Sequence, residues 1–256
     1  MSNLGDLLRA GDPDRYLATR AAPDWIQARL WPLYAFNLEI ARAPYVTAEP
    51  MIAQMRLQFW HDVLDEIAQG ARPRAHEVAT PLAQVWREAG LPLDLGHAMI
   101  AARNWDIARA PFADEAAFEG HIDATSGHLM WLSARALGAA PQAEPVVRDL
   151  AHAAGLAQWF LAVPALKAAG QTPLIDESPD TLRRLAGAGL ARLARARAAR
   201  GKVARNAGPA LMVGWQAGAI LRRARAAPER ITQGALASSE FSRRGSLLLR
   251  VLSGRW

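Results

Sequence analysis

The side chains best suited to metal chemistry in this sequence are histidines on two segments of regular spacing. His61 and Asp65 are four residues apart, as are His121 and Thr125, and His128 follows His121 by seven. Residues at these intervals share one face of a helix, where histidine and carboxylate groups can bind a metal together. However, no His-Glu-x-x-His pattern occurs and no third ligand accompanies either pair. The spacing therefore favours exposed or hydrogen-bonded helix residues, and we assign no metal ligand.

Motifs for nucleophilic catalysis and phosphate binding are also missing. The chain has no cysteine, which excludes disulfides and thiolate ligands. It has neither a Gly-x-Ser-x-Gly elbow nor a glycine-rich phosphate loop. Ser126 precedes Gly127 and His128 inside a predicted helix that offers it no acidic partner, so we interpret this serine as structural. We assign no catalytic residue.

Helices must position these side chains, because helical periodicity recurs and strand signals are nearly absent. Apolar residues three or four apart predict helices over 47–69 and 114–137, and glycine and proline residues separate such runs. The pattern predicts about eight to ten helices joined by short loops. No linker is long enough to mark a boundary. We therefore expect an all-α fold, with a single domain spanning residues 1–256 and a shared core.

Targeting and membrane signals are weak. The first residues lack the charged and apolar regions of a signal peptide. The longest uncharged apolar stretch, 150–166, falls short of a membrane span, and we interpret it as a buried helix. We expect a cytoplasmic protein, with peripheral attachment to the inner membrane as the alternative.

Charge is distributed very unevenly along the chain. Residues 1–180 carry a net charge of −8, whereas residues 181–256 carry +14, and 28 of the 30 basic residues are arginine. A basic amphipathic helix is predicted over 181–205, and such a helix suits an anionic membrane surface. A solvated outer face is the competing interpretation. Nucleic acid is not expected as a partner, because no recognised binding motif accompanies the charge.

Several short segments occur in the order and spacing of a known family. They are Asp14-Arg-Tyr, Tyr34-Ala-Phe, Arg56-Leu-Gln-Phe-Trp60, Arg103-Asn-Trp-Asp106 and Gly155-Leu-Ala-Gln. Together they resemble the squalene/phytoene synthases over nearly the whole chain. The resemblance implies an isoprenoid-synthase type of helical bundle around a central cavity. It also implies two acidic clusters that hold Mg²⁺ ions, which neutralise the diphosphate of a prenyl substrate.

The acidic clusters of active family members are missing here. The positions that match the first cluster are Ala41, Arg42 and Tyr45, and none of them is an acid. The stretch that matches the second cluster includes Leu161 and Ala162 and contains no acid at all. Both metal-binding motifs are thus degenerate at these positions, which argues against prenyl-diphosphate chemistry.

One branch of the family has the same departures. The run Phe36-Asn37-Leu-Glu39 followed by Met55-Arg-Leu-Gln-Phe-Trp60 resembles the mitochondrial complex I assembly factors of the phytoene-synthase type and their bacterial relatives. That resemblance implies a scaffold or assembly role with a protein partner, which would be a respiratory complex I subunit. An isoprenoid or other apolar lipid in the cavity is compatible with it.

Our leading hypothesis is therefore a catalytically degenerate family member that assists complex I assembly and needs no cofactor. The alternatives are a divergent prenyltransferase, which would need Mg²⁺, and an anionic membrane-surface binder acting through the arginine-rich C-terminal third. By analogy with the family we expect the following residues to reach the cavity or its ligand: Tyr34, Asn37, Glu39, Arg56, Gln58, Trp60 and Asp106.

Overall fold

Helices account for all the regular secondary structure of residues 2–256, which are the residues that the computed structural model describes. The all-α fold predicted from the sequence is therefore confirmed. In the first half of the chain the α-helices are α1 (Ser2–Gly11), α2 (Pro13–Arg20), α3 (Asp24–Arg42), α4 (Pro50–Ala68), α5 (Ala79–Glu88), α6 (Leu93–Ala102), α7 (Asn104–Ala108) and α8 (Glu115–Ile122).

In the second half, α10 is the longest helix and is followed by several helices rich in arginine. The α-helices here are α9 (His128–Ala136), α10 (Glu144–Ala168), α11 (Pro179–Ala198), α12 (Gly208–Met212), α13 (Ala217–Ala226), α14 (Glu229–Thr232) and α15 (Glu240–Ser253). Short 3-10 turns connect some of them, namely η1 (Ala43–Tyr45), η3 (Pro141–Ala143), η4 (Arg200–Lys202) and η5 (Arg205–Ala207).

The chain forms more and shorter helices than the sequence pattern predicts. The predicted helix over 114–137 is divided, because a π-helical segment, η2 (Asp123–Gly127), separates α8 from α9. The predicted basic helix over 181–205 is α11, which ends at Ala198 and gives way to 3-10 turns. The apolar spacing did not reveal the π turn, because Ile122, Thr125 and Leu129 are all buried across it.

Several helices begin at residues that satisfy the free backbone N–H groups of the first turn. The Asp12 side chain accepts a hydrogen bond from the Arg15 N–H at the start of α2, where Pro13 occupies the first helical position. Asp114 accepts from the Ala117 N–H at 2.8 Å at the start of α8. Such caps stabilise a helix by about 1 kcal/mol each and fix where the chain enters it.

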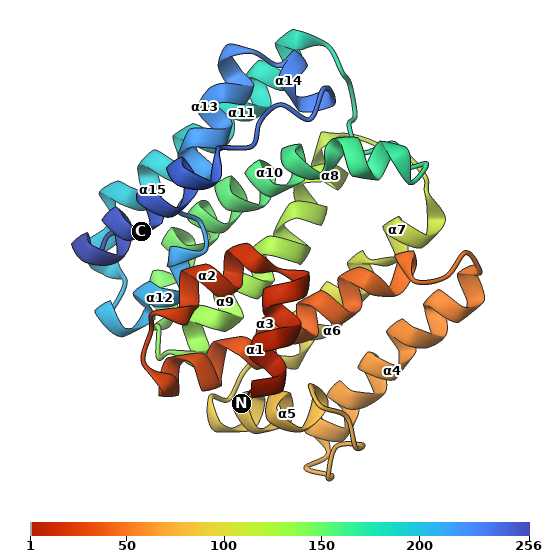
Figure 1. The fold of residues 1–256 in the computed structure, drawn as a ribbon. Coiled ribbons are helices and arrows are strands. Elements are labelled where there is room, and N and C mark those ends of the chain that lie inside the picture. The colour runs from red at the N-terminus through yellow and green to blue at the C-terminus, as the bar shows by residue number, and fades with distance from the viewer. Residues whose placement is uncertain (1) are drawn as a thin grey trace.

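Helix α10 runs through the middle of the bundle, as Figure 1 shows, with α11 and α13 packed along one side and η2 and α9 along the other. A small residue allows the approach to η2. A Cβ atom on Gly155 would lie 2.6 Å from the Ser126 Cβ and 2.9 Å from the Ile122 Cγ2. Only glycine at this position lets the two helical segments pack so closely.

Aromatic side chains fill much of the core between α3, α4 and α5. Phe36 packs edge-on against Trp60 and Trp86, with ring centroids 5.4 and 6.1 Å apart. All three rings are buried. Edge-to-face contacts of this kind add to the apolar burial and fix how the helices meet. Among the described residues, no helix combines the length and hydropathy needed to cross a membrane.

Candidate functional site

A cavity of about 330 Å³ lies between the N-terminal helices and the middle of the bundle. One wall is apolar and comes from α9, α10 and the residue after α12. The opposite wall is charged and comes from α2 and α15. The residues that line it include Asp12, Asp14, Arg15, Tyr34, Ser126, Leu129, Met130, Ala154, Gly155, Gln158, Val213 and Arg243.

The charged wall is a network in which each cation already has an acidic partner. Arg15 pairs with Asp12, and Arg243 of α15 pairs with Asp14 of α2. Gln216 donates a hydrogen bond to Asp14 at 2.7 Å. The contacts of Asp14 with Gln216 and Arg243 join residues more than two hundred positions apart in the sequence. The network therefore ties the C-terminal helix to the entrance of the cavity and leaves it close to neutral.

Tyr34 of α3 is the sequence-predicted residue that lies in this cavity. Its ring is buried, and the Arg15 guanidinium lies 5.8 Å from the ring centroid. The hydroxyl oxygen is also buried and lies next to the Ser133 side chain, without a hydrogen bond of good geometry to it. Burial raises the pKa of Tyr34, so the hydroxyl stays protonated and can donate to a ligand.

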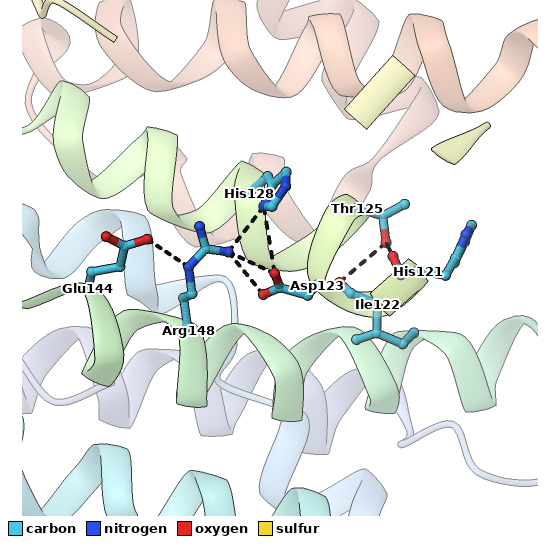
Figure 2. Close-up of polar contacts among 7 residues, drawn as sticks. All are labelled: His121, Ile122, Asp123, Thr125, His128, Glu144 and Arg148. Carbon is cyan, nitrogen blue, oxygen red and sulfur yellow. Dashed lines mark hydrogen bonds and ion pairs between the residues drawn. The ribbon is translucent and has the colours of Figure 1, made fainter. Parts of the chain in front are cut away.

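Ser126 of the π-helical segment lines the cavity, and the segment itself is held by a separate polar cluster (Figure 2). Arg148 of α10 donates to both Asp123 oxygens at 2.9 and 3.0 Å, and its Nε donates to Glu144 at 2.8 Å. The same guanidinium lies 3.0 Å from the Nδ1 of His128. Burial, with Arg148 next in effect, lowers the pKa of His128, so the imidazole is neutral and accepts this hydrogen bond.

Gly127 makes room for this cluster. A Cβ atom at position 127 would lie 2.3 Å from the Asp123 Oδ1, which folds back across the π turn. Ser126 faces α10 and lines the cavity. In Figure 2, Asp123, His128, Glu144 and Arg148 are thus paired with one another and hold the π-helical segment against α10.

The positions that match the first acidic cluster of the family lie at the end of α3 and in η1. Tyr45, at the third position, donates a hydrogen bond from its hydroxyl to the Asp106 Oδ1 at 2.6 Å. Arg103 approaches the other Asp106 oxygen at 3.7 Å and donates to the Asn37 side chain at 3.4 Å. Burial raises the pKa of Asp106, although Arg103 opposes the rise. Tyr45 thus holds one Asp106 oxygen, whereas the other is buried next to Arg103 without a hydrogen bond from the described residues.

A second cavity, of about 440 Å³, opens beside α4 and contains three more of the predicted residues. Glu39, Arg56 and Trp60 line it together with Ala43, Ile52, Met55, Phe59 and His76. Trp60 is buried and packs edge-on against both Phe59 and His76. The cavity thus has an aromatic floor, with Glu39 and the exposed Arg56 at its rim.

The structure does not bring the seven predicted residues together. Tyr34 lines the central cavity, whereas Glu39, Arg56 and Trp60 line the cavity beside α4. Gln58 is exposed on α4, where it donates to Asp62 at 2.7 Å. Leu161 and Ala162, at the second motif, are half-buried on α10, and Leu161 packs against the core.

The histidines of the sequence pattern are likewise separated. His121 is buried in an aromatic cluster with Trp105, Phe112 and Trp159, its ring centroid 5.1–5.5 Å from theirs. His61 contacts His97 with 2.8 Å between the two Nδ1 atoms on another part of the surface. Within residues 2–256 no group of three or more His, Asp or Glu side chains is arranged to hold a metal ion.

Sequence reasoning missed the charged wall of the central cavity. Asp12, Asp14 and Arg15 lie in or beside the Asp14-Arg-Tyr segment, and Gln158 ends the Gly155-Leu-Ala-Gln segment. Both segments carried the family resemblance, so that signal was available. Nothing in the local sequence, however, indicates that Arg243 reaches the same cavity from α15.

Comparison with known proteins assigns the chain to a family. The model of the squalene/phytoene synthase family matches residues 8–174. This chain belongs to the squalene/phytoene synthase family. Its fold is similar to that of a dehydrosqualene synthase solved with a ligand, with a TM-score of 0.81 at 15% identity over 98% of this chain and 95% of that one. The fold is also similar to that of a squalene synthase from Alicyclobacillus acidocaldarius. The TM-score is 0.74 at 14% identity, over 91% of this chain and 93% of that one.

Curated relatives within the family carry a different name. The chain is 26% identical over 160 residues to the Bos taurus protein named NADH dehydrogenase (ubiquinone) complex I, assembly factor 6, and 24% identical over 160 residues to that of Homo sapiens. The match covers 62% of this chain and 48% of each relative. A homologue from Drosophila melanogaster is 34% identical over 77 residues, or 30% of this chain and 23% of that protein. The chain thus spans about half the length of the mammalian relatives it matches, and less of the fly one.

The motif positions of this family member do not suit the magnesium ions that its active relatives would bind. Mg²⁺ takes carboxylate and water oxygens. Here the first motif offers a methyl group at Ala41, a guanidinium at Arg42 and a phenol at Tyr45 that is already donating to Asp106. The second motif has Leu161 and Ala162, whose side chains carry no oxygen. These donor sets do not fit the ion.

Proposed function

We propose that this chain is a non-catalytic member of the squalene/phytoene synthase family that assists the assembly of respiratory complex I at the inner membrane. The observation that carries the proposal is the pairing of Tyr45 with Asp106. The family resemblance implies an acid at position 45. Here Tyr45 stands at that position, and its hydroxyl donates a hydrogen bond to the buried carboxylate of Asp106. The relatives named complex I assembly factor 6 support the choice of process.

The surface around the cavity beside α4 is the place where we expect the partner to bind. Met51 and Met55 are 72% and 66% exposed, and Ile52 is exposed beside them. Tyr45 at the end of η1 and Val46 after it are also exposed, a few residues before α4. Methionine side chains adapt to irregular apolar partners, and exposed apolar patches of this kind mark protein interfaces. We propose that an apolar helical segment of a complex I subunit occupies this groove.

The central cavity supports a second element of the proposal, an apolar lipid or isoprenoid ligand without a metal cofactor. Leu129, Met130 and Val213 provide an apolar wall. The charged wall is paired within itself, so the ligand needs no counterion. The Tyr34 hydroxyl and the side chains of Ser126 and Gln158 are the uncharged donors we expect such a ligand to meet.

Complementation tests the assembly role. In cells that lack this protein, NADH:quinone oxidoreductase activity and the assembled complex on native gels should fall, and the full chain should restore both. The variant carrying Met51→Glu and Met55→Glu should accumulate but fail to restore them, because it puts charges into the groove. Gln142→Glu combined with Gln233→Glu adds the same two charges at exposed positions outside the groove and should restore both. Full rescue by the methionine variant would contradict the groove as the partner site.

A turnover assay tests the non-catalytic part separately. The purified chain is incubated with prenyl diphosphates, with and without Mg²⁺, and pyrophosphate release is measured. We expect release no faster than in the protein-free control. Magnesium-dependent release would refute this part of the proposal and favour a divergent prenyltransferase.

A further inference from the structure

The fold neutralises much of the basic charge that the sequence concentrates after residue 180. On α11, Arg184 pairs with Glu115 of α8 at 2.6 Å, and Arg195 pairs with Asp149 of α10 at 2.8 Å. Arg192 likewise approaches Glu119 at 3.3 Å. The acidic first part of the chain therefore offsets this stretch of α11. The predicted basic face of α11 is largely an intramolecular contact.

A different set of arginines lacks such partners. Arg197 of α11, Arg222 of α13 and Arg250 of α15 line one pocket of about 140 Å³. None of the three side chains makes a hydrogen bond or ion pair with the side chains and backbone that the structure describes, and the Nε of Arg197 is buried without a partner there. Burial first, and then the charge of Arg250, lowers the pKa of Arg197. The three cations repel one another here, so an anion between them would be stabilising.

Serine hydroxyls complete the lining of this pocket. Ser238, Ser242 and Ser246 face the arginines from the segment before α15 and from α15 itself. Ser238 accepts a hydrogen bond from Arg223, and Ser246 donates to the Arg243 carbonyl, whereas the Ser242 hydroxyl makes no such contact with the described residues. Guanidinium and hydroxyl groups are the donors that recognise phosphate oxygens.

The outer face of the same helix is apolar and uncovered. Phe241, Leu248 and Leu252 recur at intervals of seven and four, so they share one face of α15. They are 90%, 58% and 76% exposed, and Leu249 beside them is also exposed. Only Leu247 is buried, against Trp215 of the main bundle. Figure 1 shows α15 at the outer edge of the molecule, away from α4.

We propose that the edge formed by α11, α13 and α15 binds an anionic phospholipid bilayer, with a lipid phosphate held by Arg197, Arg222, Arg250 and Ser242 and the apolar face of α15 among the acyl chains. An apolar helix face bordered by arginines matches the boundary between acyl chains and anionic headgroups. A second copy of the chain fits less well, because a two-fold contact across this edge would oppose one set of arginines to the other. The inference is independent of the proposed assembly role.

Vesicle co-sedimentation of the full chain tests the proposal. Wild-type protein should bind vesicles containing phosphatidylglycerol and not vesicles of pure phosphatidylcholine. The triple variant Arg197→Gln, Arg222→Gln, Arg250→Gln should bind about fivefold more weakly per arginine removed. Leu248→Ser combined with Leu252→Ser, which leaves every charge in place, should weaken binding by about tenfold or more.

A matched variant separates this site from general charge attraction. Arg183, Arg184 and Arg195 are paired with acids on other parts of the surface, so replacing all three by glutamine removes the same total charge. This control should bind the anionic vesicles at least tenfold more tightly than the site variant. Equal loss in the two triple variants, equal binding to neutral vesicles, or self-association that these substitutions abolish in the absence of lipid would each overturn the proposal.

Discussion

Mild acid should destabilise this protein, because two buried histidines remain neutral in the folded state. Burial lowers the pKa of His121 to about 3 and that of His152 to about 4, from an ordinary value near 6.5. Below about pH 6.5 the unfolded chain binds protons at these positions and the folded chain does not. The free energy of unfolding therefore falls as the pH falls through this range.

The size of the effect follows from the shift in proton binding. Between about pH 7.5 and pH 5, each histidine lowers the free energy of unfolding by ~2 kcal/mol, since the interval below pH 6.5 is ~1.5 pH units at 1.36 kcal/mol per unit. The two together cost ~4 kcal/mol, a large fraction of the stability of an ordinary domain. Urea unfolding followed by circular dichroism at the two pH values measures the difference.

The variant His121→Leu isolates one of the two contributions. His121 makes aromatic contacts, and its Nε2 has no hydrogen-bond partner among the described residues, so leucine removes a titrating group from an apolar site. The loss of unfolding free energy between the two pH values should be ~2 kcal/mol smaller in the variant. His152 and the carboxylates remain in both proteins and cancel in the comparison. An identical pH dependence in variant and wild type would refute the reasoning.

Three further substitutions probe the packing of α10 and the buried pair of Tyr45 and Asp106. Gly155→Ala places a methyl group 2.6 Å from the Ser126 Cβ. It should lower the free energy of unfolding, measured in urea, by about 1–3 kcal/mol. An unchanged urea midpoint would show that α10 and η2 can separate at no cost. Tyr45→Phe removes the hydrogen bond to Asp106 and should lower the free energy of unfolding by about 1–3 kcal/mol. Asp106→Leu leaves Arg103 buried without its acid and should lower it by about 3–5 kcal/mol. The reverse order of these two costs in the same unfolding assay would show that Arg103 does not depend on Asp106.

The sequence determined the helical class and the family by itself, because both depend on local order. Apolar spacing sets which face of a helix is buried, and the short aromatic segments keep their order whatever their contacts. The motif positions Ala41, Arg42 and Tyr45 could also be read directly, since a missing carboxylate is a property of the residue. The helix boundaries around η2 could not be predicted, because the apolar residues on both sides of the π turn keep a helical spacing.

Only the tertiary structure decided which charges meet. Tyr45 and Asp106 are 61 residues apart, and Arg184 reaches Glu115 across 69, distances over which the sequence carries no geometric signal. The fold also divided the arginines of the C-terminal third into paired ones on α11 and the unpaired set of Arg197, Arg222 and Arg250. Whether a charge is neutralised or left open to a partner depends on what packs beside it, and only the folded chain fixes that.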